Sequence, residues 1–295
     1  MEDDKNYKET KDIIILMKDI FAYSEIIKKA RSFFGDVHGF IEVPAQSRLS
    51  ILAACENPHS IVKFNFGGKD YPLPQTGQMW LEEELLIHPD VPGVFCFTTS
   101  YRDEKEEDMV DGRHDKIFPM IEFESKGGLN KLISLEGGFL EHFGFRNGKE
   151  LLYEDACKRY GVNIIGDEEE RKIGGDYGNV TYLKKFPMRT HPFWNMKHAG
   201  EGIFNKVDVL IHGMETIGSA ERSINVEEMR NNFYTISDGA YAGKLFSDFG
   251  KKRVEVELEK YLSLKMFERF GGGIGVTRLA RAMYLEGLLD KREAA

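Results

Sequence analysis

The sequence predicts an α+β fold in which helices flank a mixed, mainly antiparallel sheet. Short apolar segments of strand length follow one another with turn residues between them, as in hairpin-connected strands. Other segments place apolar residues at helical spacing and interrupt the strands. Runs of strands interrupted by helices favour this class over a doubly wound parallel sheet.

The first half of the chain contains a helical start and most of the predicted strands. Residues 6–34 have the apolar spacing of an amphipathic helix or helix pair. The composition of Gly67-Gly68-Lys69-Asp70 is that of a hairpin turn. The predicted strands are residues 40–43, 61–66, 94–99 and 118–123.

The second half is predicted to be richer in helices. Residues 162–185 are polar and glycine-rich and are predicted to form an excursion or lid. Helices are expected at 129–143, 150–160, 226–242, 251–267 and 276–288. Gly161 is expected to cap the second of these helices, and a glycine-rich turn precedes the last one. Strands are expected at 207–211 and 215–217. The sequence has no internal repeat and no low-complexity linker, so residues 1–295 are predicted to form a single domain.

Composition narrows the class of protein. The 41% hydrophobic and 30% charged residues are ordinary for a globular protein, and no apolar run is long enough to cross a bilayer. The acidic start Met1-Glu2-Asp3-Asp4 is unlike a signal peptide. The three scattered cysteines (Cys55, Cys96 and Cys157) lack zinc-ligand spacing and suit a reducing compartment. A cytoplasmic protein is expected.

Net charge bears on the partners. The chain carries a formal charge of −9, whereas proteins that hold nucleic acid usually present a surplus of Lys and Arg to the phosphates. Unless the chain has a local basic patch, this balance argues against nucleic acid as an obligatory partner.

One candidate site lies around Arg102. Arg102 and Glu104 are two residues apart at a predicted strand end, so they share one face. After a charged loop, the return strand carries Phe118 and the alternating carboxylates Glu122 and Glu124. Arginine suits a phosphate, glutamate an exocyclic amine, and an aromatic ring a nucleobase. Taken alone, the pattern also fits a solvated, charge-rich hairpin.

A second candidate site is the glycine-rich segment 270–275. It leads into a predicted helix whose first turn carries Arg278, where backbone N–H groups and a guanidinium can meet a phosphate. A glycine-rich turn is weak evidence by itself. The spacing to Arg278 and the helix behind it strengthen it.

These residues resemble the motifs of class II aminoacyl-tRNA synthetases. Arg102-Asp103-Glu104 resembles motif 2, and residues 273–279 resemble motif 3. Residues 208–222 are similar to the segment before motif 3 in the aspartyl, asparaginyl and lysyl subgroup. Residues 53–57 with 75–82 resemble the asparaginyl enzymes most. The four segments occur in the family's order and extend the resemblance over about residues 12–288.

The resemblance implies an ATP site. Catalysis is assigned to two arginines: Arg102 would hold the α-phosphate and Arg278 the γ-phosphate. The other expected ATP contacts are Glu104 at the adenine or ribose end, Phe118 stacked on adenine, His114 on a phosphate, and the glycines Gly273 and Gly275. Asp208 and Glu215 would hold Mg²⁺ ions that bridge the phosphates, in keeping with the preference of Mg²⁺ for oxygen ligands.

The resemblance also implies an amino-acid site. Glu56 and Glu122 would bind the α-ammonium group, directly or through water, and Gln78 would reach the α-carboxylate. Arg222 would hold a side-chain carboxylate or amide oxygen, and Glu82 would face the side chain. The implied reaction is attack of the amino-acid carboxylate on the α-phosphate of ATP, giving an aminoacyl-adenylate and pyrophosphate.

Four departures from the family pattern bear on the acceptor, the substrate and the dimer. The core begins almost at once, without room for the N-terminal anticodon domain, and the motif 2 loop at 105–111 is rich in carboxylates that would repel RNA. Leu81 replaces a lysine of the aspartyl enzymes and of their asparagine-synthetase relatives, whereas Glu82 matches the asparaginyl enzymes, so the pocket is expected to suit an amide or amine and to disfavour aspartate. Pro44 falls two residues before the family proline of motif 1, which helps build the dimer, and Gln46 takes the place of that proline. A homodimer is still expected.

Four functions stay open at this point. The chain resembles stand-alone asparagine synthetase-related paralogues, in which ammonia attacks a β-aspartyl-adenylate. It also fits a ligase that transfers an asparagine-like amino acid to a non-tRNA acceptor. A minimal tRNA-charging enzyme and a non-catalytic module fit less well. Two further expectations are that Trp194 belongs to the core and that Asp167–Arg171 is a solvated charge run.

Overall fold

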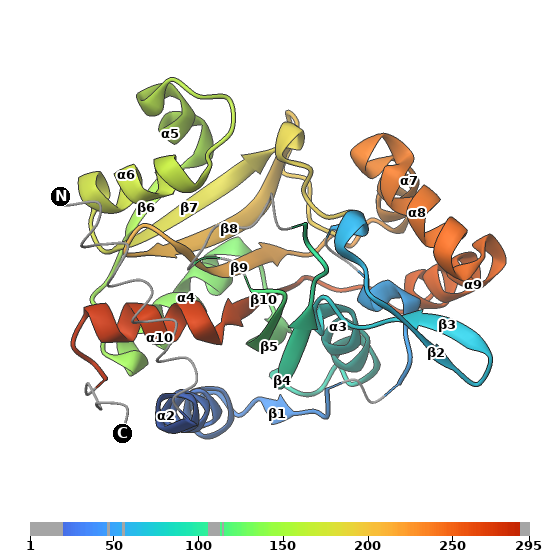
Figure 1. Ribbon diagram of the computed structural model, residues 1–295, viewed down its shortest axis with the longest axis horizontal. Helices are drawn as coiled ribbons and strands as arrows, with labels where there is room; N and C mark the ends of the chain where they lie inside the picture. The colour runs from blue at the N-terminus through green and yellow to red at the C-terminus, as the bar shows by residue number, and fades with distance from the viewer. Residues whose placement is uncertain (1–19, 46–47, 55–56, 106–112, 114, 290–295) are drawn as a thin grey trace.

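An eight-stranded sheet organises the computed structural model, which describes residues 20–45, 48–54, 57–105, 113 and 115–289 (Figure 1). All neighbouring strands in it pair antiparallel except the two at the edges, β1 with β4 and β6 with β7. In spatial order the strands are β1 (Ile41–Glu42), β4 (Gly93–Tyr101), β5 (Ile117–Lys126), β10 (Arg269–Gly275), β9 (Glu215–Glu221), β8 (Ile203–Ile211), β7 (Val180–Pro187) and β6 (Lys149–Leu152). The predicted mixed, mainly antiparallel sheet is confirmed.

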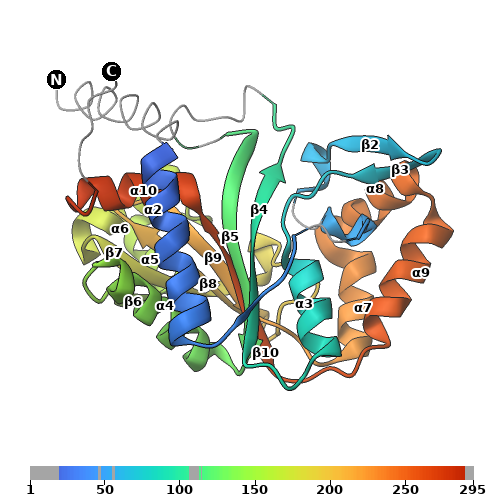
Figure 2. The same ribbon diagram turned by 90° about the horizontal axis from the view of Figure 1, so that it is seen from below.

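Helices cover the sheet from both sides. In Figure 2, α2 (Ile20–Arg31), α4 (Leu129–Phe143) and α10 (Val276–Leu285) lie on one side of the central strands. They bury the main apolar core, which includes Phe34, Phe123 and Phe139. On the other side lie α3 (Gln78–Ile87), α7 (Val226–Thr235), α8 (Ala240–Phe249) and α9 (Lys251–Leu262). Helices α5 (Tyr153–Tyr160) and α6 (Asp167–Tyr177) pack against β7.

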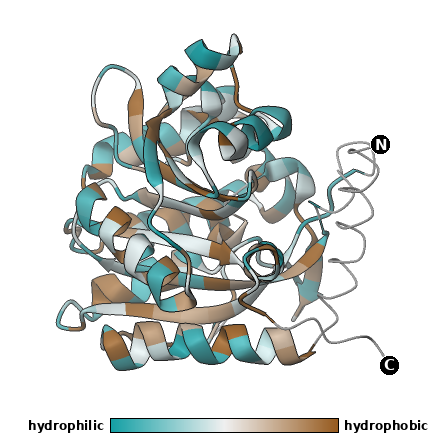
Figure 3. Ribbon diagram, turned by 90° about the vertical axis from the view of Figure 1, so that its left-hand side faces the viewer, coloured by the Kyte–Doolittle hydropathy of each residue, from teal (hydrophilic) through white to brown (hydrophobic). Residues whose placement is uncertain are grey.

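Each surface helix has a polar face and an apolar face, and the apolar face packs against the core. In Figure 3 these helices carry both hydrophilic and hydrophobic residues, as expected for elements with one buried face. A second core lies under α7, α8 and α9, where Trp194 is buried with Phe233 and Tyr261 around it. The prediction that Trp194 is a core residue is confirmed. Among the described residues, no helix is long and apolar enough to cross a membrane.

Several predicted elements are confirmed. The hairpin of β2 (Lys63–Phe66) and β3 (Lys69–Pro72) turns at Gly67 and Gly68, whose φ angles of 59° and 76° suit a two-residue turn. Gly161 ends α5 in the left-handed region, with φ 69°. The predicted strands at 94–99, 118–123, 207–211 and 215–217 lie within longer strands.

The predicted lid at 162–185 is wrong. This segment forms α6 and begins β7, a strand inside the sheet with Val180, Tyr182 and Leu183 buried. Most of its polar, glycine-rich part belongs to α6, which buries only Ile173 and therefore has a weak apolar pattern. The predicted helix at 150–160 is also partly wrong, because its first residues form the edge strand β6.

The predicted glycine-rich turn before the last helix is wrong as well. Residues 269–275 form β10, a central strand paired with both β5 and β9. Glycine is needed there because a side chain would not fit, and not because the chain turns. A Cβ on Gly271 would lie 1.9 Å from Oε1 of Glu124, and one on Gly272 would lie 2.6 Å from Cβ of Ser219.

Helix boundaries account for the remaining differences. The short helical turn Ile236–Gly239 separates α7 from α8, because Ser237 and Asp238 have positive φ, and α9 ends at Leu262. Residues 78–87, which had no predicted helix, form α3. Of the predicted N-terminal helix, residues 20–31 form α2 and 32–37 form a π-helical turn, and the rest lies outside the described residues.

Candidate active site

A cavity of about 620 Å³ lies where β5, β10 and β9 meet α3. Eleven of the fourteen residues expected at the site from the sequence line it: Gln78, Glu82, Arg102, Glu104, Phe118, Glu122, Glu215, Arg222, Gly273, Gly275 and Arg278. Asp208 is buried directly beside the cavity. Glu56 and His114 lie outside the described residues.

The expected ATP end is built by the β4–β5 hairpin. Strand pairing ends at Tyr101 and Ile117, and the backbone N–H of Arg102 then donates to the carbonyl of Lys116 at 2.8 Å. The Arg102 guanidinium lies over the ring of Phe118, 5.1 Å from its centroid. This cation–π contact orients both side chains at the cavity wall.

Arg278 lies on another wall of the expected ATP end of the cavity. It lies in the first turn of α10 and donates to the backbone carbonyl of Glu215 at 2.8 Å and to that of Arg113 at 3.3 Å. Its guanidinium therefore joins the start of β9 to the segment that follows the motif 2 loop.

Arg113 was not expected at the site but lines the cavity. It is buried and forms ion pairs with Asp167 and Glu170 of α6. Glu170 also accepts a hydrogen bond from the backbone N–H of Glu215 at 3.0 Å. The prediction of a solvated charge run at 167–171 is therefore wrong for Glu170, because α6 packs this carboxylate against Arg113 and β9.

Asp208 and Glu215 are brought together over Gly218. A Cβ on Gly218 would lie 2.9 Å from Oε1 of Glu215 and 3.7 Å from Oδ1 of Asp208, so both carboxylates reach the same point above the sheet. Oδ1 of Asp208 is buried and accepts no hydrogen bond from the described residues. An unpartnered carboxylate oxygen next to a second carboxylate fits Mg²⁺, although the described part of the chain has no group of three or more possible metal ligands.

Lys206 is an unexpected neighbour of this pair. Its Nζ donates to Oδ2 of Asp208 at 2.7 Å, and its side chain lines the cavity. Burial raises the pKa of Asp208 to about 7, and Glu215 adds to this effect while Lys206 opposes it. Burial lowers the pKa of Lys206, but the charges of Asp208 and Glu215 outweigh burial and raise it overall.

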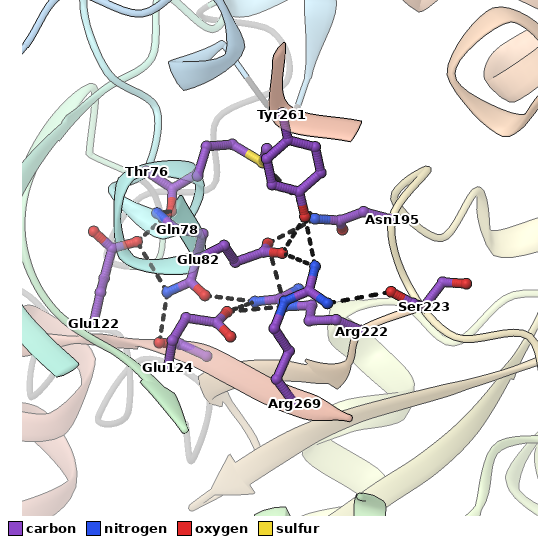
Figure 4. Close-up of polar contacts among 12 residues, drawn as sticks. Thr76, Gln78, Glu82, Glu122, Glu124, Asn195, Arg222, Ser223, Tyr261 and Arg269 are labelled. Carbon is purple, nitrogen blue, oxygen red and sulfur yellow. Dashed lines mark hydrogen bonds and ion pairs between the residues drawn. The ribbon is translucent and has the colours of Figure 1, made fainter. Parts of the chain in front are cut away.

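The amino-acid end begins with Glu122, in the middle of β5 (Figure 4). Its carboxylate is fully buried and accepts from the backbone N–H of Gly77 at 2.7 Å and from the hydroxyls of Thr76 and Thr98. The Nε2 of Gln78 donates to the carbonyl of Gly272 at 2.8 Å, which ties α3 to β10. These bonds fix the carboxylate and the amide before any substrate is present.

Arg222 lies at the far end of the cavity. Its Nε and Nη2 donate to Oε1 of Glu124 at 2.9 and 2.6 Å, and Nη2 also donates to Gln78. Nε lies 3.4 Å from Glu82. The prediction from the sequence placed Arg222 and Glu82 at the site, and the structure places them in contact (Figure 4).

Glu82 is surrounded by donors. Besides Arg222, it receives hydrogen bonds from the amide of Asn195 at 2.6 Å, the hydroxyl of Tyr261 at 2.5 Å and the guanidinium of Arg269 at 2.7 Å. The sequence interpretation missed Asn195, Tyr261 and Arg269. They come from distant parts of the chain, and no local pattern marks them as members of one cluster.

Burial changes the ionisation of the two carboxyl groups, Glu82 and Glu124, that contact Arg222. Burial raises the pKa of Glu124 to about 8 despite the nearby Arg222. Burial also opposes ionisation of Glu82, but Arg222 and Arg269 outweigh it and hold the pKa of Glu82 below its usual value. Arg222 and Arg269 therefore face two buried carboxyl groups whose pKa values are shifted in opposite directions.

Leu81 does not line the cavity. It is fully buried on the opposite side of α3, against Leu85, Val94 and Cys96. In this structure the position is part of the core, so the loss of the expected lysine leaves no gap in the cavity wall.

The sequence and the fold are similar to those of known proteins. The family model of tRNA synthetases class II (D, K and N) matches residues 16–288. The asparaginyl-tRNA synthetase of Pyrococcus horikoshii complexed with asparaginyl-adenylate superposes with a TM-score of 0.70 at 20% identity, over 92% of this chain and 65% of that one. The asparaginyl-tRNA synthetase of Entamoeba histolytica in complex with asparaginyl-adenylate gives 0.68 at 20% identity, over 94% and 64%.

An aspartyl enzyme is similar as well. The aspartyl-tRNA synthetase of Entamoeba histolytica gives a TM-score of 0.62 at 17% identity, over 92% of this chain and 56% of that one. No curated protein matches the sequence. The chain spans just under two thirds of the length of the asparaginyl enzymes. Since the family model covers nearly all of it, the chain belongs to the class II tRNA synthetases of the D, K and N type, a family of ATP-dependent ligases that form aminoacyl-adenylates.

Proposed function

We propose that this chain is an ATP- and Mg²⁺-dependent, AMP-forming ligase that activates aspartate and transfers it to ammonia, as an asparagine synthetase does. One observation carries the proposal: the cavity has a cationic group at each end, Arg222 at one and Arg102 with Arg278 at the other. Aspartate has two carboxylates. The α-carboxylate would bind at Arg222, in place of the side-chain group that the family resemblance implies there, while the β-carboxylate reacts with ATP near Arg102.

The amino-acid end supports a dicarboxylic substrate. Arg222 lines the cavity at this end, and burial raises the pKa of its partner Glu124 to about 8, so Glu124 offsets less of the guanidinium charge. The substrate ammonium group would bind at Glu122, which lines the cavity between the two ends. Leu81 is no obstacle, because the guanidinium groups come from Arg222, directly after β9, and from Arg269 on β10.

The proposed reaction has two steps. An oxygen of the β-carboxylate of aspartate attacks the α-phosphorus of ATP, the bond from that phosphorus to the oxygen bridging it to the β-phosphate breaks, and pyrophosphate leaves. The nitrogen of ammonia then attacks the acyl carbon of the adenylate, AMP leaves with the bonding electrons, and the new amide nitrogen loses a proton. Arg102 and Arg278 would stabilise the charge that develops on the phosphates. Mg²⁺ held by Asp208 and Glu215 would neutralise phosphate charge when bound.

The acceptor is inferred from charge. Residues 105–111, in the loop that meets the tRNA acceptor end in the synthetases, include four carboxylates, and the whole chain has a formal charge of −9. Both features would repel an RNA backbone and leave a small neutral acceptor unaffected. The loop itself lies largely outside the described residues.

Amino-acid-dependent ATP–pyrophosphate exchange tests the proposal. We expect exchange with aspartate and Mg²⁺, and formation of asparagine and AMP when ammonium is added. Arg102→Ala is expected to reduce exchange by about a hundredfold or more, the scale for loss of one charge-stabilising donor. Arg230→Ala is the matched control, because Arg230 forms ion pairs with Glu227 and Glu259 outside the cavity. Exchange with aspartate that gives no asparagine on adding ammonium would refute the acceptor, and exchange with asparagine alone would refute the substrate.

A second candidate rests on Glu82. This carboxylate lines the cavity and already accepts a hydrogen bond from the amide of Asn195. A substrate amide placed at the same position would favour asparagine or an asparagine-like amino acid, transferred to a non-tRNA acceptor. Exchange with asparagine and none with aspartate would select this candidate.

We also propose that the chain forms a homodimer. Ile41 of the edge strand β1 is 50% exposed, and Val37, in the helical turn before that strand, is 61% exposed; β1 has only β4 as its described neighbour. Exposed apolar residues next to an open strand edge are typical of a surface that another chain covers.

A further inference from the structure

Lys206 places an ammonium group at the two carboxylates expected to bind metal. It precedes Asp208 by two residues on β8, so the two side chains lie on the same face of the sheet. Its Nζ is 2.7 Å from Oδ2 of Asp208. The ring of Phe186, whose centroid is 4.1 Å from Nζ, supports the ammonium group from the neighbouring strand β7.

This ammonium group changes the site in two ways. It occupies one oxygen of Asp208 and leaves Oδ1 as the oxygen without a hydrogen bond. It also reduces the formal charge of the Asp208–Glu215 pair from −2 to −1. A divalent cation between the carboxylates would thus share its ligands with a fixed positive charge. The guanidinium of Arg278, bound to the carbonyl of Glu215 at 2.8 Å, adds a second positive charge nearby.

We propose that Lys206 is an internal counter-ion that prevents Asp208 and Glu215 from holding a divalent cation on their own. Metal then binds at this pair only together with ATP, whose phosphates supply the missing negative charge and oxygen ligands. Lys206 is a positioning residue in this scheme: it determines when the metal binds, and it need not touch the reacting atoms. The inference rests on the proposed ATP site, but its test does not require turnover.

Mn²⁺ binding to ATP-free protein, measured from the free-ion signal in electron paramagnetic resonance, tests this role. We expect weak Mn²⁺ binding by the wild-type chain. Lys206→Met keeps the length of the side chain and removes its charge, so it is expected to lower the Kd for Mn²⁺ by about tenfold or more, as loss of a nearby like charge implies. Asp208→Asn in the Lys206→Met background is expected to abolish the gain.

Two further variants control the experiment. Lys206→Arg keeps the charge and is expected to bind Mn²⁺ as weakly as the wild type. Lys184→Met removes a lysine of β7 that pairs with Glu150 away from the cavity, and it should also leave binding unchanged. Circular dichroism and thermal melting would verify that each variant is folded.

Two results would overturn the inference: tight Mn²⁺ binding by the ATP-free wild type, or an unchanged Kd in folded Lys206→Met protein. The outcome is separable from that of the proposed function. A chain that activates no amino acid but gains Mn²⁺ affinity on loss of Lys206 would refute the reaction and support the counter-ion. Aspartate-dependent exchange with no change in Mn²⁺ affinity in the Lys206→Met variant would support the reaction and refute the counter-ion.

Discussion

At the scale of single residues, several carboxyl groups are buried where their ionisation is unfavourable. Glu136 of α4 is 1% exposed and lies behind the sheet, close to the Ser219 hydroxyl. Burial raises the pKa of Glu136 from 4.5 to about 8, with a further contribution from Asp208. A carboxyl group held protonated in the core has a consequence for the pH dependence of stability.

Substitution of Glu136 tests that consequence. Because the folded-state pKa lies above the unfolded one, Glu136 stabilises the fold at low pH, and this contribution is lost as the pH rises from about 4.5 to 8. We expect Glu136→Gln to flatten the pH dependence of the free energy of unfolding by up to about 1.4 kcal/mol per pH unit in this window. Urea denaturation at several pH values measures it.

The control for this prediction is Glu141→Gln, on the exposed side of the same helix. It is expected to leave the pH dependence unchanged. An equal effect of both substitutions would show that the dependence does not come from burial of Glu136.

The role of a residue could be predicted when the residue belongs to a short sequence motif. It could not be predicted when the role depends on contacts between distant parts of the chain. Arg102, Phe118 and Arg278 were found because short motifs mark them, and the structure places all three at one cavity. Arg269 has no such motif, since its partner Glu82 is 187 residues away in the sequence. Lys206 was missed for a different reason. Its spacing of two from Asp208 was visible in the sequence, but a lysine on a strand is usually a surface residue.

At the scale of elements, β10 is a strand that its amino-acid composition does not predict. Four glycines in five residues predict a turn, because glycine destabilises strands on average. The strand forms because β5 and β9 supply partners on both sides, and because the side chains of Glu124 and Ser219 fill the space that a Cβ would need. Neither effect is readable from a local window of sequence. The same applies to β7, whose buried residues follow a polar helix.

Replacing a glycine in β10 measures this packing. In Gly271→Ala, the new Cβ would lie 1.9 Å from Oε1 of Glu124 and 2.5 Å from the carbonyl oxygen of Phe123, so the strands must separate. We expect a loss of about 1–3 kcal/mol in the free energy of unfolding, measured with a chemical denaturant.

Gly243→Ala in α8 is the matched control. A Cβ there meets nothing within 4 Å, and helical alanine is favoured over glycine by about 0.5–1 kcal/mol. This variant is therefore expected to be slightly stabilised. Similar losses in both variants would contradict the packing argument for β10.

At the scale of the whole molecule, the fold class was predictable and the oligomer remains a prediction. The alternation of strand-like and helical segments indicated the α+β class, and the sheet order confirms it. Association depends on the surface near α2 and β1, where Val37 and Ile41 are exposed. The sequence indicates this surface only indirectly, because exposure of an apolar residue is a property of the folded chain.

Sedimentation equilibrium tests the dimer. We expect the wild-type chain to have twice the mass of one polypeptide, because association would cover Val37 and Ile41. Ile41→Lys places a charge on the exposed edge strand and is expected to shift the equilibrium to monomer, since a buried unpaired charge is unfavourable. Ile164→Lys, at another exposed apolar position away from this edge, is the control. A monomeric wild type, or a fully dimeric Ile41→Lys variant, would contradict the proposal.

The glycines of β10 also limit how this enzyme can acquire new substrates. Main chain at Gly272, Gly273 and Gly275 lines the cavity, so this part of the wall has no side chain to exchange. Mutation can alter the shape and charge of the cavity only from its other walls, for example from α3, through Gln78 and Glu82, and from the segment after β9, through Arg222. Any redesign of this chain for a new substrate should therefore act through those walls and keep the glycine wall as it is.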